Sequence, residues 1–355
     1  MLIDRRSFIL GILSALPFVS RAFAEENLAA LAGQLVSDGQ ICAVQIATLR
    51  AGQIAQTLAV SGCGTAPPDG TVFQAASLSK PVVAFLALRM AERGELAFDT
   101  PVNAWLPGGY LHRQNIFALK AAPVVDLVPP DILRQVTPRM LLSHSAGFPN
   151  WSQSGPLKLE FTPGARWQYS GEGYVLLQRV LETVSGLPLQ ELAAREVFGP
   201  MGMTDTAFKI THAIEPHLVA GSPRQLRFPY EIASSSLYTN AASYARFLAG
   251  LLADEKTMAL TLSHPVALPS SWGAFLQSKR LSWGLGWGVE VRDAPVAIWH
   301  WGNNPGFRSL VMADLQSRDA IVVLTASDQG MAMAKRLVNA EIPGEHPALE
   351  LDLVR

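Results

Sequence analysis

The chain has few cysteines and few charged residues. It contains two cysteines among 355 residues, too few for a multi-disulfide scaffold or a four-thiolate zinc site. Charged residues make up 16% of the chain, and the net charge is −1. A nucleic-acid-binding protein needs a cationic surface, and the sequence has no basic block, so it excludes that class. The apolar content of 49% excludes an intrinsically disordered chain.

Long apolar runs are also missing. The uncharged stretch Ser7–Ser20 offers about 13 apolar residues, whereas a membrane-spanning helix needs about 20. The pair Arg5-Arg6 precedes it, and the small-x-small sequence Ala22-Phe23-Ala24 follows. This arrangement is typical of an export signal and resembles a twin-arginine signal. We expect residues 1–24 to be removed, leaving a periplasmic or secreted protein without a stable membrane span; an uncleaved N-terminal anchor is the alternative.

Several motifs for cofactors and catalysis are absent. The chain has no G-x-S-x-G nucleophile elbow, no H-E-x-x-H and no G-x-x-x-x-G-K-[ST]. Its seven histidines show no paired metal-ligand spacing, and Gly284–Gly288 misses the spacing of a dinucleotide-binding loop. We therefore expect no metal and no cofactor, and the α/β-hydrolase fold is disfavoured.

Strand-like segments occur at both ends of the chain. Apolar runs between turns predict antiparallel strands at Ile41–Leu49, Ile54–Val60, Gly284–Val291, Val296–Trp301, Ser309–Asp314 and Ala320–Ala326. Helical spacing of apolar residues predicts helices at 28–36, 82–90, 171–184, 190–197, 240–252 and 331–340. This order predicts an α/β (α+β) fold, in which one antiparallel sheet built from both chain ends is flanked by helices.

Residues 25–345 are interpreted as one domain with two lobes. The sheet lobe would take residues 25–80 and 281–345, and an inserted, mostly helical lobe would take residues 81–280. Within the second lobe, residues 95–128 contain several prolines and glycines, which predicts loops. Residues 346–355 would form a C-terminal tail.

The two cysteines flank the first predicted hairpin. Its turn would be Arg50–Gln53, with Gly52 taking a positive φ. With a two-residue loop Cys42 faces Ser61, and Cys63 lies diagonally at about 7 Å or more, the limit for a disulfide. The expected arrangement is therefore two small buried thiols. A disulfide, which export would permit, is the alternative.

The tetrapeptide Ser77-Leu78-Ser79-Lys80 has the spacing of a nucleophile and its base. Residues three apart share a helix face, so Ser77 and Lys80 would touch. A serine hydroxyl needs an adjacent base, and a lysine among apolar neighbours can lose its proton near neutral pH. The backbone N–H of Ser77 would point where an oxyanion forms. Taken alone, this motif more commonly marks a solvated helix face.

Two later motifs support the catalytic interpretation. Tyr169-Ser170-Gly171 precedes a predicted helix, and His300-Trp301-Gly302 ends a predicted strand. The order S-x-x-K, Y-x-[NG], [KH]-x-G resembles the serine β-lactamase and penicillin-binding superfamily, and in particular the class C β-lactamase-related serine hydrolases. Further segments similar to that family are Gly94–Leu96, Asp99–Val102, Trp105–Pro107, Leu141–Phe148, Pro200–Thr206, Asn304–Phe307 and Ser327–Gly330. The resemblance covers roughly residues 27–340.

The resemblance implies a β-lactamase/transpeptidase-like fold and an acyl-enzyme mechanism without metal or cofactor. Ser77 would be the acylated nucleophile, and Lys80 and Tyr169 would share the role of base. A phenol titrates at about pKa 10, and a neighbouring ammonium favours its phenolate, so the two groups would be coupled. The N–H groups of Ser77 and Asn303 would form the oxyanion hole. The other substrate-binding residues would be Gly171, His300, Trp301 and Gly302.

Two positions depart from the β-lactamases. Gly171 replaces an asparagine whose amide meets the substrate's amide side chain. His300 replaces a lysine, which would keep a full charge for a substrate carboxylate. The pattern therefore favours a carboxylic-ester or D-amino-acid amide or peptide hydrolase with weak or no β-lactamase activity. The substrate is expected to be a small-molecule ester, amide or lactam. A class C-like β-lactamase, or a penicillin-binding or sensor module that is acylated without turnover, is the alternative.

Other side chains near these motifs have two interpretations each. His144 resembles a triad histidine, but its place in a turn favours a structural role. Ser79 is expected to be a helix-packing hydroxyl, and Trp301 could serve packing alone or form a wall of the acyl pocket. Glu172 could act as a second proton shuttle. His112 and the surrounding loop would shape the mouth of the substrate site.

Overall fold

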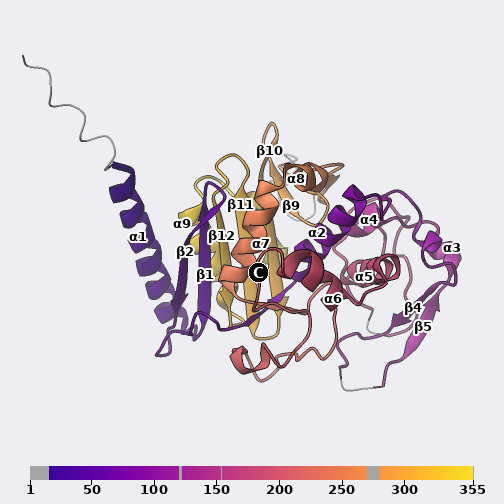
Figure 1. Cartoon of the computed structure of the whole chain (residues 1–355), viewed down its shortest axis with the longest axis horizontal. Helices are drawn as coiled ribbons and strands as arrows, with labels where there is room; N and C mark the ends of the chain where they lie inside the picture. Colours follow the sequence, from indigo (N-terminus) through magenta and orange to yellow (C-terminus); the bar gives the residue numbers. More distant parts are fainter. Residues whose placement is uncertain (1–15, 120–121, 153, 270–279, 355) are drawn as a thin grey trace, which may run out of the picture.

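A computed structural model of the chain describes residues 16–119, 122–152, 154–269 and 280–354. Within this part, the centre is an eight-stranded antiparallel sheet with the strand order β2-β1-β12-β11-β10-β9-β8-β7 (Figure 1). Its strands are β1 (Val44–Arg50), β2 (Gln53–Val60), β7 (Val266–Ala267), β8 (Leu281–Trp283), β9 (Gly288–Val291), β10 (Pro295–Asn304), β11 (Phe307–Asp314) and β12 (Ala320–Thr325). Since β1 pairs with β12, the sheet joins both chain ends, and the predicted fold class is confirmed.

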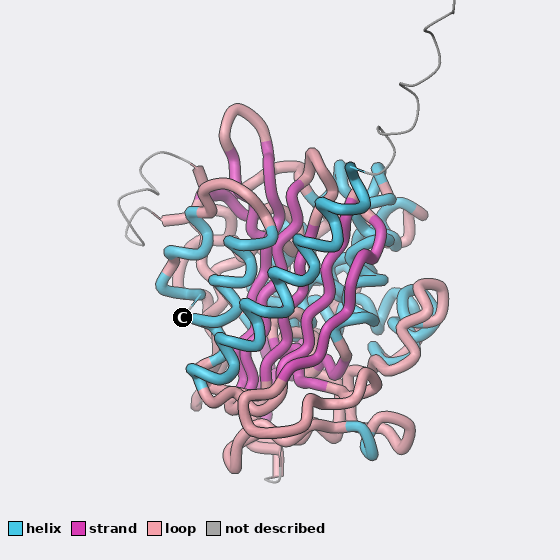
Figure 2. Tube along the Cα trace, turned by 90° about the vertical axis from the view of Figure 1, so that its left-hand side faces the viewer, coloured by secondary structure: helices cyan, strands magenta, loops and turns pink. Residues whose placement is uncertain are grey.

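Helices cover both faces of this sheet. α1 (Leu16–Gly39) and α9 (Gly330–Glu341) pack together on one face, where they cross in front of the strands in Figure 2. α7 (Ala241–Ala253) packs on the other face against β1, β2 and β12. Its buried residues Tyr244, Ala245 and Leu248 recur at helical spacing and form one apolar stripe. The sheet therefore recruits a helix from the segment 81–280, which the sequence analysis had assigned to the helical lobe.

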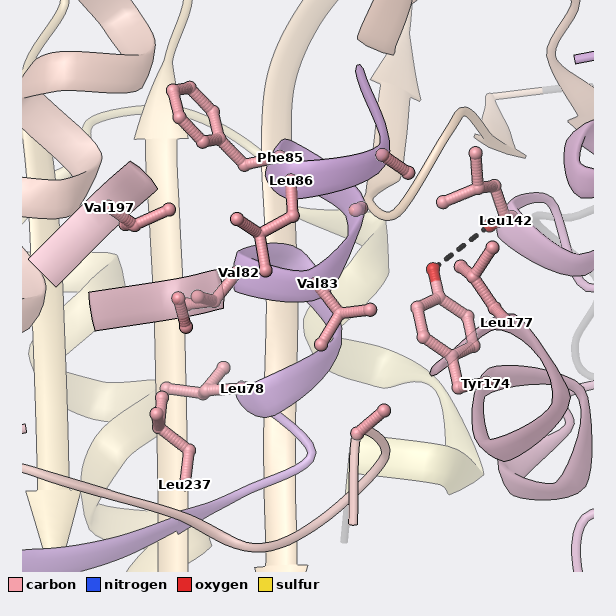
Figure 3. Close-up of a cluster of buried hydrophobic side chains, with 14 of the residues drawn as sticks. Leu78, Val82, Val83, Phe85, Leu86, Leu142, Tyr174, Leu177, Val197 and Leu237 are labelled. Carbon is pink, nitrogen blue, oxygen red and sulfur yellow. Dashed lines mark hydrogen bonds between the residues drawn. The ribbon is translucent and has the colours of Figure 1, made fainter. Parts of the chain in front are cut away.

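The second lobe surrounds α2 (Ser79–Glu92). This helix is buried on nearly all sides, because between Pro81 and Leu88 it carries only apolar side chains. Val82 and Val83 point to opposite sides of it in Figure 3. The remaining helices are α3 (Pro130–Leu133), α4 (Pro138–Leu142), α5 (Gly171–Ser185), α6 (Leu189–Ala193) and α8 (Glu255–Thr261). Two small two-stranded antiparallel sheets pair β3 (Phe73–Ala76) with β6 (Leu237–Thr239), and β4 (Tyr110–Arg113) with β5 (Val125–Val128).

Two sequence expectations are corrected by this arrangement. The region 95–128 is not only loop, because β4 and β5 pair within it. Residues 346–355 are not a separate tail, because the short helical turns Pro347–Glu350 and Asp352–Val354 pack into the core beside the sheet. Ala348, Leu349 and Leu351 are buried there. Their apolar side chains explain why the last residues fold back onto the domain.

The N-terminal region enters the described structure only in part. Residues 1–15, with Arg5 and Arg6, lie outside the described residues, and residues 16–24 belong to α1. In the part of the chain that the structure describes, no helix has both the length and the apolar character needed to cross a bilayer. Removal of residues 1–24 and export stay predictions.

Cys42 and Cys63 form a disulfide, so the expectation of two buried thiols was wrong. The predicted turn is present, and Gly52 has a positive φ of 78°. A β-bulge after Thr48, however, shifts the register between β1 and β2 by one residue. Cys63 therefore lies one position, not two, from the residue that faces Cys42, and the Cα atoms are 4.8 Å apart. Both cysteines are exposed.

We predict that the disulfide contributes measurably to stability. It closes a loop with a sequence separation of 21, which by loop-closure entropy is worth about 3 kcal/mol of unfolding free energy. Dithiothreitol should therefore lower the midpoint of urea unfolding, followed by tryptophan fluorescence. A Cys42→Ser/Cys63→Ser variant is the control, because it should start at the lower midpoint and ignore the reductant. Equal midpoints for the oxidised and reduced wild type would contradict this prediction.

Candidate active site

Ser77 lies in a sharp turn between β3 and α2. The residue before it, Ala76, has a φ of 51°, a left-handed conformation that costs alanine free energy. Ser77 itself is partly exposed, while Ala76 and Leu78 on either side are buried. The turn thus presents one serine hydroxyl at the surface of an otherwise buried segment.

Three contacts hold this turn in place. The Ser79 hydroxyl donates to the Ala76 carbonyl at 2.6 Å and accepts from the Leu237 N–H at 2.9 Å. Ser79 therefore ties the turn to β6, which is more than the packing role we expected. The Ser309 hydroxyl donates to the Ala75 carbonyl at 2.8 Å. At Gly302 a Cβ would overlap that same carbonyl, so β10 can approach the turn only with glycine at this position.

Lys80 lies directly behind the serine. Its Nζ is 3.1 Å from Ser77 Oγ and donates to the Ser234 carbonyl at 2.7 Å. It also lies 4.7 Å from the centre of the Tyr169 ring. Lys80 is fully buried, and among the described residues no carboxylate comes within ion-pair distance of it. Burial lowers the pKa of Lys80 well below its usual range. A neutral amine beside a serine hydroxyl can accept its proton.

The two sequence neighbours of Tyr169 are hydrogen-bonded to His144. The Gln168 N–H donates to the His144 carbonyl at 2.8 Å, and the Ser170 N–H donates to His144 Nδ1 at 3.1 Å. Burial and the nearby Lys80 lower the pKa of His144 well below its usual range, which keeps Nδ1 free to accept. The structural role expected for His144 thus has a specific form: it positions the tyrosine next to the serine and lysine.

The tyrosine is the weaker candidate for the base. Burial raises the pKa of Tyr169, and the neighbouring Ser77 hydroxyl lowers it only in part. The phenol therefore stays protonated near neutral pH, whereas burial acts on Lys80 in the opposite direction and favours its neutral form. The two pKa directions favour Lys80 over Tyr169 as the candidate base and favour Tyr169 as a candidate proton donor, which would be a sharper division than the shared role implied by the sequence.

His300 is an uncharged residue of β10. It is fully buried, and its Nδ1 lies 2.8 Å from the Trp301 carbonyl, to which it can donate. Burial, together with the nearby Lys80, lowers the pKa of His300 to about 3. The imidazole is therefore neutral at pH 7, as expected from the replacement of lysine.

A cavity of about 520 Å³ opens in front of Ser77. Four of the predicted residues line it: Ser77, Tyr169, Trp301 and Asn303. Lys80 lies behind Ser77, and Gly171, His300 and Gly302 do not contribute to the wall. The Trp301 ring lies beside the Tyr169 ring, with centroids 4.9 Å apart and planes tilted by 35°. Because Trp301 lines the cavity, it has the wall role of the two roles expected for it.

The structure adds residues that sequence reasoning missed. The further lining residues are Phe117, Asn150, Trp151, Leu226, Ser235, Asn304 and Pro305. Asn150 and Trp151 directly follow the segment Leu141–Phe148 and Pro149, so the family-like pattern ended just before them. Among the described residues of this wall none is charged. No cluster of metal-ligating side chains was found in the described part of the chain.

Comparison with known proteins supports the family resemblance and the fold independently of the site geometry. The family model described as Beta-lactamase matches residues 28–341. Esterase EstB of Burkholderia gladioli is 26% identical over 301 residues, or 68% of this chain and 72% of EstB. Penicillin-binding protein 4* of Bacillus subtilis is 22% identical over 76% of this chain, and the match spans 64% of that protein, less than two thirds of its length. A class C beta-lactamase structure gives a TM-score of 0.70 at 15% identity, covering 92% of this chain and 98% of the other, which shows a common fold.

We predict that Lys80→Ala and Tyr169→Phe each slow acylation of Ser77 by about 100-fold or more, the usual contribution of an acid–base group. If neutral Lys80 is the base, the wild-type acylation rate should rise with pH as the Lys80 amine loses its proton. The rate should reach its plateau at a pH well below the ordinary pKa of lysine, because burial lowers the pKa of Lys80. Labelling by a fluorophosphonate probe, followed by intact mass, measures this rate. Lys256→Ala, at an exposed lysine, is the matched control. A Lys80→Ala variant that keeps the wild-type rate and pH profile would remove Lys80 from the mechanism.

A second prediction concerns His300. Because its pKa is lowered to about 3, its ring should stay neutral between pH 5 and 8, the range in which an ordinary histidine titrates. NMR of histidine-labelled protein should show ring signals of His300 that do not move over this range. In urea the same signals should titrate at about pH 6.5. A midpoint inside the range in the folded protein would show that His300 offers a charge to the site after all.

Proposed function

The chain belongs to the Beta-lactamase family of serine hydrolases, and on that premise we propose that it hydrolyses carboxylic esters through an acyl-enzyme on Ser77. One observation carries the proposal: Ser77 Oγ lies 3.1 Å from a buried lysine amine and opens into a cavity without charged lining residues in the described chain. The amine activates the serine, and the uncharged wall suits a neutral substrate. The 26% identity with an esterase points the same way.

The proposed reaction has two steps. Ser77 Oγ attacks the ester carbonyl while its proton passes to Nζ of Lys80. Tyr169 then gives its phenolic proton to the leaving alcohol as the C–O bond breaks, and it regains a proton from Lys80. A water molecule attacks the acyl-enzyme in the same manner and releases the acid and free Ser77.

The negative charge that forms on the carbonyl oxygen requires hydrogen-bond donors. We propose the backbone N–H groups of Ser77 and Asn303, since both residues line the cavity. The loss of one such donor typically costs about 100- to 1000-fold in rate.

We propose esters as substrates ahead of β-lactams because the site offers no positive charge for a substrate carboxylate among the described lining residues. A β-lactam carries a carboxylate, and His300 is neutral where a β-lactamase has lysine. D-amino-acid amides are the second substrate class, supported by the family and by the uncharged wall.

We further propose that the protein acts outside the cytoplasm. The exposed Cys42–Cys63 disulfide supports this, since disulfides persist in oxidising compartments.

The test uses p-nitrophenyl acetate with the purified wild type and a Ser77→Ala variant. We expect turnover and an acetyl mass on the wild type, and neither on Ser77→Ala. Nitrocefin, assayed in parallel, should be hydrolysed weakly or not at all. Strong nitrocefin turnover would replace the proposal by a β-lactamase. A lasting nitrocefin adduct without turnover of either compound would replace it by a penicillin-binding or sensor module.

A further inference from the structure

Trp151 occupies the space beside the first residue of α5. A Cβ at Gly171 would lie 2.7 Å from Cζ2 of the Trp151 ring and still closer to Cη2, so any side chain there would collide with the indole. The space that an asparagine side chain would take at position 171 is therefore not empty. The large aromatic ring of another segment fills it, and that ring lines the cavity.

The two residues beside Trp151 are tied to the first turn of α5. On one side, the Gly171 N–H donates to the backbone carbonyl and to Oδ1 of Asn150, both at 3.0 Å, and the Glu172 N–H donates to the same carbonyl at 3.1 Å. On the other side, the Ser152 N–H donates to Glu172 Oε1 at 2.8 Å. Trp151 is thus held at both of its peptide neighbours, which fixes its place on the wall.

Glu172 serves this anchor rather than proton transfer. It is 1% exposed, and its second oxygen, Oε2, lies 3.2 Å from His112 Nε2. His112 Nδ1 lies 2.9 Å from Asp126 Oδ1. Burial lowers the pKa of His112, but the neighbouring carboxylates of Glu172 and Asp126 outweigh burial and raise it. One oxygen of Glu172 accepts a hydrogen bond from the loop and the other lies within ion-pair distance of His112, and Glu172 does not line the cavity, so the second proton shuttle considered from the sequence does not fit its surroundings.

An aromatic side chain packs against Trp151. Phe117 meets its ring edge-on, with centroids 4.6 Å apart and planes at 75°. Leu226 and Trp301 add apolar surface to the cavity wall, and its polar lining residues are uncharged serines, asparagines and Tyr169. A flat apolar group can stack on such a surface, whereas a charged group would lose its water without gaining an ionic partner among the described lining residues.

We propose that Trp151 is the specificity-determining residue of this site and that it selects substrates with an uncharged aromatic acyl group. The inference rests on the proposed function, whose substrate class it narrows. Contact is assigned to the acyl group because Trp151 lines the cavity into which Ser77 opens, and the acyl group is the part of the substrate that stays bonded to Ser77 after the alcohol leaves.

The test compares p-nitrophenyl phenylacetate with p-nitrophenyl acetate, which share a leaving group and differ in the acyl group. Trp151→Ala should lower kcat/KM for the phenylacetate about 10-fold relative to the acetate, mainly through KM, as expected for the loss of one aromatic contact. Trp151→Phe should retain most of the preference. Trp105→Ala, at a partly buried tryptophan outside the cavity wall, is the matched control and should leave the ratio unchanged.

A second variant tests the same contact from the other side. Gly171→Ala should displace the indole and reduce the ratio as Trp151→Ala does. The double variant should be no worse than Trp151→Ala alone, because both changes remove one interaction. An unchanged ratio in Trp151→Ala, or an equal fall for both esters, would overturn the inference.

The proposed function and this inference can fail separately. If the wild type hydrolyses neither ester, the proposed function fails, and the inference is decided by binding alone. Benzylboronic acid and methylboronic acid, measured by thermal shift on the same variants, then replace the two esters. A preference for the benzyl compound that Trp151→Ala abolishes supports the inference, and equal binding of both overturns it.

Discussion

The burial of the Lys80 amine is the constraint on which the rest of the site depends. An ammonium group taken out of water without a carboxylate partner is costly, so the neutral form is favoured. This requires α2 to be apolar on nearly all sides, with helices and strands of both lobes packed around it. The sheet and the helical lobe together provide that dry environment. The amine gains a hydroxyl 3.1 Å away and one backbone carbonyl, and this arrangement turns an ordinary serine into a candidate nucleophile.

The same burial decides the state of the neighbouring groups. Aromatic and histidine rings, rather than charged side chains, surround Lys80: Tyr169 and Tyr174 contact it, and His144 and His300 lie close enough for its charge to lower their pKa values. A second ammonium at position 300 would raise the cost of protonating either group. Because His300 is neutral, it does not repel the positive charge that Lys80 would gain by accepting the proton of Ser77. The exchange of lysine for histidine therefore affects the base as well as substrate binding.

Features set by local sequence were predictable, and features set by contacts between distant segments were not. The contact between Ser77 and Lys80 was predicted from their spacing of three residues, and it is present although Ser77 lies in the turn before α2, where the Lys80 N–H donates to the Ser77 carbonyl at 3.0 Å. The order of strands and helices predicted the sheet. The disulfide was missed because one bulge residue after Thr48 shifts a register that hairpin length alone could not reveal. The position of Trp151 depends on a loop packing onto the start of α5, and no periodic pattern encodes that contact.

Charge is distributed in this molecule so that the cavity itself remains neutral. The carboxylates of Glu172, which is buried, and Asp126, which is partly buried, lie against His112, and neither residue lines the cavity. This trio holds a backbone segment, while Ser77, Lys80 and Tyr169, the proposed reacting groups, have no ionic partner among the described residues. The charged group of His112, Glu172 and Asp126 therefore contacts the first turn of α5 through Glu172, and it is kept out of the cavity wall. Because Gly171 begins that turn, it serves both sides: its N–H binds the anchored loop, and its missing side chain leaves room for the aromatic wall.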